Sequence, residues 1–136
     1  MSIINLVWLY LASAATFFAL DMLWLGFIAK NLYRDSLAHL LADNFNRVAA
    51  FGFYAIFLIG VLIFAVIPAL NEGNFAKAAI YGALFGFFTY ATYDLTNLST
   101  LKNWPLGLTF IDIAWGAFLT ASVAMVAYQV GRWLGL

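Results

Sequence analysis

Four long stretches of this chain are almost free of charged side chains: residues 3–27, 48–70, 76–98 and 110–134. Each can cross a hydrocarbon core of about 30 Å as an α-helix, which rises about 1.5 Å per residue. Only 9% of all residues are charged and 66% are hydrophobic, whereas an average soluble domain has about 25% charged residues. Helices with so little polar surface would not dissolve in water, so an integral membrane protein is predicted.

The four stretches predict an all-α fold in a single membrane domain, residues 1–136, built as a four-helix transmembrane bundle. Polar or helix-breaking residues separate the stretches. Lys30 follows the first, Pro68 and the turn 71–74 end the second, and Pro105 lies in the polar loop after the third. We therefore expect the lipid bilayer to surround these four helices.

The segment Lys30–Arg47, between the first and second spans, has a different pattern. Hydrophobic residues recur at helical spacing between charged ones: Tyr33, Leu37, Leu40, Leu41 and Phe45. A short amphipathic helix lying in the membrane interface fits this pattern, and so does a loop helix that packs on the bundle. Asp43 is predicted to cap the second span.

The basic residues predict an orientation. Lys30, Arg34, Arg47 and Lys102 lie in the first and third loops, whereas only Lys77 and Arg132 lie on the other side. The positive-inside rule places the first and third loops in the cytoplasm and both termini outside. Because the difference is small, a dimer of oppositely oriented copies stays an alternative.

Composition also excludes several classes of function. The formal net charge is zero, which gives no electrostatic basis for binding nucleic acid. The chain has no cysteine, so disulfides, thiolate metal sites and thiol redox chemistry are excluded. With His39 as its one histidine it has no histidine-rich metal site. No metal and no cofactor are predicted.

Three carboxylates lie inside the predicted spans: Asp21, Asp94 and Asp112. A charged residue near the bilayer centre costs roughly 2.5–3.5 kcal/mol on insertion scales, and such residues are commonly functional. The first and third spans end, and the fourth begins, on one side of the membrane. By helical rise the three acids lie about 13 Å, 6–10 Å and 5 Å deep, which predicts a ladder of acids in the cytoplasmic half.

Each acid also has a structural interpretation. Thr109 and Asp112 fit a capping box at the start of the fourth span. Asp94 can pair with Lys102 or reach water. Asp21, the deepest, has no cation in its own helix and can bond to a polar side chain of a neighbouring helix; in its neutral form it could carry a proton.

Two of the acids are followed by tryptophan at the same spacing. Asp21 precedes Trp24 and Asp112 precedes Trp115 by three residues, so each indole lies one turn from its acid on the same helix face. Both indoles are predicted about 9 Å deep. They can donate N–H bonds to the acids, form part of an aromatic cage for a cation, or anchor the helices in the interface.

The third span carries a polar stripe. Tyr90, Asp94 and Asn97 follow one another at spacings of four and three, and Gly82 and Gly86 continue the stripe as a step that favours close helix packing. We therefore expect the stripe to face the bundle. The predicted ligand-binding or proton-carrying residues are Asp21, Asp94, Asp112, Trp24, Trp115, Tyr90, Tyr93 and Asn97.

Several motifs together resemble a bacterial membrane-protein family known only as a domain of unknown function, numbered twenty-one seventy-seven. They are Asp21-x-x-Trp24-Leu25-Gly26, Lys30-x-x-Tyr33, Tyr93-Asp94-Leu95-Thr96-Asn97, Trp104-Pro105 and Asp112-Ile113-Ala114-Trp115-Gly116. The resemblance covers nearly the whole chain. It implies a four-helix fold in the bacterial inner membrane, and it implies no catalytic role for any residue.

Three functions stay open. The favoured one is a protein that binds or transports a small cationic or amphipathic ligand at the intramembrane Asp/Trp/Tyr cluster. The second is a membrane enzyme acting on a lipid or isoprenoid substrate, with paired acids as general acid and base. Against it, the spans contain no Glu, no Cys and no His. The third is an accessory subunit of a larger membrane complex. A homodimer is an alternative assembly.

Overall fold

The computed structural model describes residues 1–136, and every regular element in it is a helix. The elements in chain order are α1 (Ile3–Leu23), the π-helical turn η1 (Trp24–Ile28), α2 (Lys30–Leu37), α3 (Arg47–Val61), the π-helical turn η2 (Leu62–Val66), α4 (Ile67–Glu72), α5 (Phe75–Thr100) and α6 (Leu106–Trp133). The prediction of an all-α fold is confirmed.

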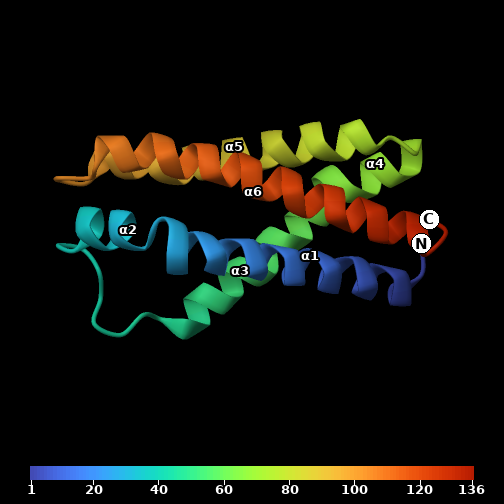
Figure 1. Cartoon of the computed structure of the whole chain (residues 1–136), viewed down its shortest axis with the longest axis horizontal. Coiled ribbons are helices and arrows are strands. Elements are labelled where there is room, and N and C mark those ends of the chain that lie inside the picture. Colours follow the sequence, from blue (N-terminus) through green and yellow to red (C-terminus); the bar gives the residue numbers. More distant parts are fainter.

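The helices lie roughly along one axis, with both termini at one end (Figure 1). α5 and α6 form an antiparallel hairpin, and α1 packs along the other side of α6. The rod made of α3, η2 and α4 crosses this group diagonally and meets α5 and α6 mainly through η2 and α4. The amino-terminal part of α3 diverges from the bundle, and no residue of α3 before Phe57 is buried.

Three helical segments are long and apolar enough to cross a membrane: Ile3–Ile28, Arg47–Glu72 and Leu106–Trp133. They correspond to the predicted spans 3–27, 48–70 and 110–134. The third predicted span, 76–98, lies within α5, which has 26 residues but is less apolar because its second half is rich in Thr, Tyr and Asn. The chain thus has three clear candidate spans, which supports a multi-pass membrane protein.

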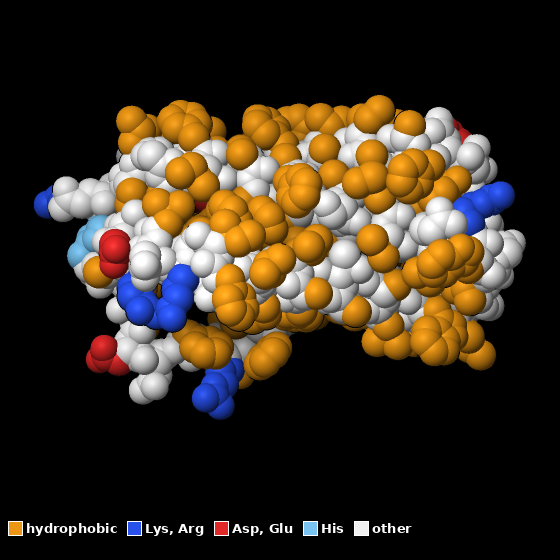
Figure 2. Space-filling model, viewed as in Figure 1, with side chains coloured by type: hydrophobic (Ala, Val, Ile, Leu, Met, Phe, Trp, Pro, Cys, Tyr) orange, Lys and Arg blue, Asp and Glu red, His pale blue; other side chains and the backbone are white.

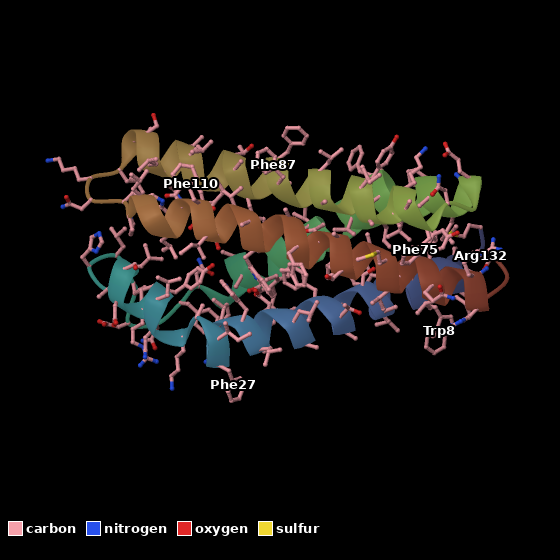
Figure 3. The ribbon with its side chains drawn as sticks, turned by 45° about the horizontal axis from the view of Figure 1, so that its top comes forward. Trp8, Phe27, Phe75, Phe87, Phe110 and Arg132 are labelled. Carbon is pink, nitrogen blue, oxygen red and sulfur yellow. The ribbon has the colours of Figure 1, made fainter.

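The surface agrees with this assignment. Hydrophobic side chains cover the middle of the molecule, and most charged side chains lie at its two ends (Figure 2). The rings of Phe27 and Phe87 point outward from their helices (Figure 3). Phe27 is 81% exposed, which is favourable against lipid and costly in water.

The interior has two distinct halves. Toward the termini, a dry core of aliphatic and aromatic side chains includes Leu9, Phe17, Val61 and Leu119. Toward the loops, the buried groups include polar ones, which are Asp21, Asp94 and Thr109. The polar half is the one that carries the candidate site.

Two details of the sequence prediction were wrong at the helix ends. Asn46, not Asp43, caps α3, because its Oδ1 accepts the Ala49 N–H at 3.0 Å and a cap must directly precede the first turn. α6 begins at Leu106, four residues before the predicted start at 110. The predicted short amphipathic helix between the first and second spans is present as α2, Lys30–Leu37, and an irregular segment follows it.

Pro68 does not end the second span. It lies in the first turn of α4, directly after η2. Proline has no N–H and its ring would collide with the carbonyl of Phe64 four residues earlier in a regular α-helix. In η2 the Ile67 N–H bonds to the Leu62 carbonyl, and this wider turn lets the helix continue past the proline. The rod ends at Gly73, which adopts a left-handed conformation with φ of 59°.

Candidate functional site

The α5–α6 hairpin is held together by small residues at a spacing of four. An added Cβ on Gly82 would lie 2.8 Å from the Ala124 side chain, and one on Gly86 would overlap Thr120. One step further toward the loop, the ring of Tyr90 covers Gly116. The predicted glycine seam is therefore a real close approach of two helices.

The next residues along this seam are two acids, Asp94 on α5 and Asp112 on α6. Their carboxyl groups lie near one another across the two helices. Asp94 is 1% exposed, and its Oδ2 atom receives no hydrogen bond from any donor group. Two like charges at close range repel each other, and a proton shared between the two carboxyl groups would relieve this repulsion.

The structural interpretations of these two acids were wrong. Asp112 does not cap α6, because the helix starts six residues earlier and Thr109 bonds back to the Pro105 carbonyl at 2.8 Å instead. Asp94 forms no ion pair with Lys102, because the one ion pair in the structure joins Lys77 to Glu72. Asp94 also does not reach water.

Tyr33 connects the first helix to this acid pair. The Tyr33 hydroxyl donates to Asp112 Oδ1 at 2.6 Å and accepts the Trp24 indole N–H at 3.0 Å. Burial, reinforced by the hydrogen bond that Tyr33 donates to Asp112, raises the pKa of its phenol well above the usual value. The hydroxyl therefore stays a hydrogen-bond donor throughout the physiological pH range.

The π-helical turn η1 allows Tyr33 to reach Asp112. It follows Leu23 directly, and the Ala29 N–H bonds to the Trp24 carbonyl five residues back. Ala29 then leaves helical geometry with φ of −113° and ψ of 22°. The chain turns at this point, which aims Tyr33 of α2 back at the cluster.

Asp21 accepts a hydrogen bond from the second tryptophan. The Trp115 indole N–H donates to Asp21 Oδ1 at 3.2 Å, and Asp21 is 6% exposed. The rings of Trp24 and Trp115 stack in parallel, with centroids 4.5 Å apart and planes 8° apart. Since the two rings cover one another, they do not form a cage with room for a cation between them.

Tyr90 lies one turn from the acids on the hairpin, with its ring over Gly116 of α6. Tyr90 also lines a cavity of about 360 Å³, together with Phe53, Phe57, Thr89, Tyr93 and Asp112. The acid cluster therefore has an open space on one side.

Two of the predicted site residues lie further out. Tyr93 is 58% exposed on the rim of the cavity, and its ring meets that of Trp104 edge to face at 5.9 Å. Asn97 is half-buried one turn beyond Asp94, toward the α5–α6 loop. No hydrogen bond joins its side chain to any of the three acids, so Asn97 is peripheral in this structure.

Some residues at the site were not predicted to be there. Tyr33 stands out in the sequence only as part of an amphipathic pattern and of the Lys30-x-x-Tyr33 motif. Phe53 and Phe57 lie in an uninterrupted apolar run and carry no signal of their own. Nothing in the sequence shows which face of that run meets α5.

The cluster is chemically unusual in its charge balance. It contains three carboxyl groups, and no Lys or Arg side chain forms an ion pair with any of them. They do not form a group of three or more metal-ligating side chains either. What the arrangement can do is hold and release protons, accept hydrogen bonds, and attract a positively charged group through its one open side.

Comparisons with known proteins identify a family but no activity. The family model described as "Predicted membrane protein (DUF2177)" matches residues 6–129. Neither the search of curated proteins nor that of solved structures found a match. The matched range includes all three acids, both stacked tryptophans and every residue lining the cavity. The chain therefore belongs to the DUF2177 family of predicted membrane proteins.

Proposed function

We propose that this protein binds, and exchanges against protons, a small cationic or amphipathic ligand at the cluster of Asp21, Asp94 and Asp112. The observation that carries the proposal is that Asp112 lines a cavity, Asp21 and Asp94 are buried near it, and no basic side chain pairs with any of the three acids. Burying such groups is costly unless a proton or another cation compensates them. The protein supplies neither Lys nor Arg for this purpose.

The acid pair suggests how a proton takes part. In this proposal, Asp94 and Asp112 share one proton while the cavity is empty of cations. A cation that enters the cavity and binds Asp112 favours the ionised form of that carboxyl. The shared proton is then released as the cation binds, and its return displaces the cation. Charge in the buried cluster stays constant during the exchange, which avoids an extra uncompensated charge.

The aromatic residues add to the attraction for a cation. Tyr90 and Tyr93 line the cavity next to Asp112, and the faces of aromatic rings attract cations within about 6 Å. Trp24 and Trp115 act differently, because both indole N–H groups are used to hold Tyr33 and Asp21. We assign them a positioning role.

We further propose that the protein sits in the bacterial inner membrane with four spans. α5 is the fourth, because its 26 residues run beside the 28 residues of α6 along the same axis. This assignment places the first and third loops, with four of the six basic residues, on the cytoplasmic side. Both termini then lie on the outer side.

Single cysteines test this topology, because the natural chain has none to interfere. A membrane-impermeant maleimide applied to intact cells should label Asn71→Cys and should not label Ala38→Cys or Lys102→Cys. Labelling of Lys102→Cys together with Asn71→Cys would show that α5 does not cross. Labelling at all three positions in one population would show dual topology.

Ligand binding is tested with purified protein in nanodiscs. Protonated octylamine should bind, and neutral octanol should bind at least about tenfold more weakly. Asp112→Asn should lose at least as much affinity for octylamine, whereas Glu72→Gln, an acid at the opposite end of the molecule, serves as the unaffected control. Calorimetry in buffers of different ionisation enthalpy should report protons released on binding. Equal binding of amine and alcohol, or full affinity in Asp112→Asn, would refute the proposal.

A membrane enzyme is the second candidate, favoured by the acid pair itself. Two neighbouring carboxyl groups, one of which lines a cavity of about 360 Å³, are an arrangement that general acid–base chemistry can use. A lipid or isoprenoid would then be the substrate. Lipid analysis of a deletion strain should show a missing product, restored by the wild-type gene and not by Asp94→Asn. An unchanged lipid profile would remove this candidate.

A further inference from the structure

The cavity beside Asp112 lies where two groups of helices separate. Phe53 and Phe57 of α3 form one wall, and Thr89, Tyr90 and Tyr93 of α5 form the other, with Asp112 of α6 at the inner end. One end of this space is thus an acid, and most of its lining is aromatic.

The cavity exists because α3 leaves the bundle. α3 meets α5 at Phe57, whose ring centroid lies 5.4 Å from that of Phe85 and 6.2 Å from that of Tyr90. Before Phe57 no α3 side chain is buried, and Phe53 is 51% exposed. Figure 1 shows α3 diverging from the other helices toward the loop end. The cavity therefore lies on the side of the molecule, between α3 and α5, where a bilayer would surround it.

On the side of α2, Asp112 is already in contact with Tyr33, whose hydroxyl donates to Asp112 Oδ1 at 2.6 Å. The stacked indoles of Trp24 and Trp115 close the space next to them. Beyond these groups, His39 Nε2 lies 3.1 Å from the Asn103 carbonyl oxygen and ties the segment after α2 to the α5–α6 loop.

We propose that the ligand reaches Asp112 from within the bilayer, through the gap between α3 and α5, and that it is a lipophilic cation: an amine carried on a hydrocarbon chain. This inference rests on the proposed function and adds the class of ligand and its route. The positive head binds Asp112 and the faces of Tyr90 and Tyr93. The chain lies along Phe53 and Phe57 and extends into the lipid. A volume of about 360 Å³ accommodates the head and the first part of the chain, since small-molecule sites start at roughly 300 Å³.

Two threonines of α5 provide a matched pair of variants. Thr89 lines the cavity, and Thr92, one turn along, is exposed and lies outside it. Both hydroxyls bond to the carbonyl four residues earlier, at 2.8 Å and 2.6 Å. Thr89→Phe fills the cavity, whereas Thr92→Phe makes the same chemical change on a lipid-facing surface. Differences in helix propensity therefore cancel between them.

The experiment measures binding of dodecylamine, butylamine and dodecanol to the protein in nanodiscs. Dodecylamine should bind at least about tenfold more tightly than butylamine and dodecanol, and Thr89→Phe should lower its affinity about tenfold while Thr92→Phe leaves it unchanged. Binding is expressed relative to the concentration of each ligand in the bilayer. The stronger partitioning of long-chain compounds into lipid is then not mistaken for tighter binding to the protein.

The outcomes separate this inference from the proposed function. If butylamine binds as tightly as dodecylamine and Thr89→Phe has no effect, the ligand comes from water. The lateral route is then wrong, although cation binding at Asp112 stands. If no amine binds, or binding is independent of Asp112, the proposed function fails and the inference fails with it. Thr89→Phe protein that elutes as a folded species in detergent, with wild-type thermal stability, excludes misfolding as the cause of a loss.

Discussion

The ring of Tyr90 lies directly over Gly116, so that the two helices of the α5–α6 hairpin are in contact at the depth of the acid cluster. This contact fixes the distance between α5 and α6 one turn away from Asp94 and Asp112. The acid pair consequently depends on a glycine that carries no chemistry of its own.

Gly116→Ala is expected to destabilise the protein by about 1–3 kcal/mol, because the added methyl group would overlap the Tyr90 ring and force the helices apart. Gly107→Ala on the same helix is the control, since a Cβ there meets nothing within 4 Å. Thermal unfolding in mild detergent measures both. Equal stability of the two variants would show that the hairpin is not closely packed at Gly116.

Tyr33→Phe is expected to cost about 1–3 kcal/mol of stability. The change removes the donor to Asp112 and leaves the Trp24 indole N–H without its acceptor. Tyr10→Phe provides the comparison, because its hydroxyl makes a long 3.4 Å bond in an exposed position and its loss should cost less than about 0.5 kcal/mol. Denaturation in mixed micelles compares them. A smaller effect for Tyr33→Phe than for Tyr10→Phe would contradict the hydrogen-bonded bridge.

The ionisation of Tyr33 gives a test that depends on pH. Because its pKa is raised in the folded protein, its contribution to stability is fully present below the unfolded value of about 10 and is lost only at higher pH. Ultraviolet titration of folded wild-type and Tyr33→Phe protein should therefore count the same number of tyrosines ionising up to about pH 12. In unfolded protein the variant should count one fewer. A difference already seen in the folded state would show that the phenol is not held protonated.

The bond between Trp115 and Asp21 is suited to a double-mutant cycle. Trp115→Phe leaves a buried carboxyl without its donor and should cost about 1–3 kcal/mol. In an Asp21→Leu background the same change should cost less by about 1 kcal/mol, because no carboxyl remains to be satisfied. Trp8→Phe, at an exposed position near the termini, should be additive with Asp21→Leu. Additivity of Trp115→Phe as well would argue against the bond.

Much of the fold could be predicted from the sequence because apolar length and small-residue spacing act locally. The three clear candidate spans match predicted ones to within four residues at each end. The step Gly82-x-x-x-Gly86 indicated the face of α5 that meets α6. These features depend only on one helix and its immediate neighbour, so they can be recognised in the sequence.

The pairing of acids and indoles was only partly predictable, because it depends on where α6 begins. With the start at Leu106, Trp115 lies nine residues into the helix, about 13 Å, which is the depth predicted for Asp21. Asp112 then lies about 9 Å deep, the depth predicted for Trp24. Each acid thus lies at the depth of the indole on the other helix, and Trp115 bonds directly to Asp21. A start at 110 places the same residues at unequal depths and hides the relationship.

The remaining parts of the site could not be predicted, because they arise from departures from regular helices. The cavity exists because α3 diverges before Phe57. The angle at which an apolar helix packs on its neighbours cannot be predicted from its sequence alone. Tyr33 reaches Asp112 only because η1 and Ala29 redirect the chain. Neither π-helical turn has a sequence signal beyond the proline that follows η2.

The π-helical turn at Trp24–Ile28 has a consequence for how this site can vary among homologues. A π turn holds one more residue than an α turn of similar height, and a one-residue insertion into an α-helix is enough to create it. Deleting Gly26 would restore the regular helix and rotate everything after it by about 100°, which would carry Tyr33 off Asp112 altogether. Homologues that are one residue shorter between the positions of Asp21 and Tyr33 should accordingly have no conserved phenol there, and their acid pair should obtain its donor from another helix.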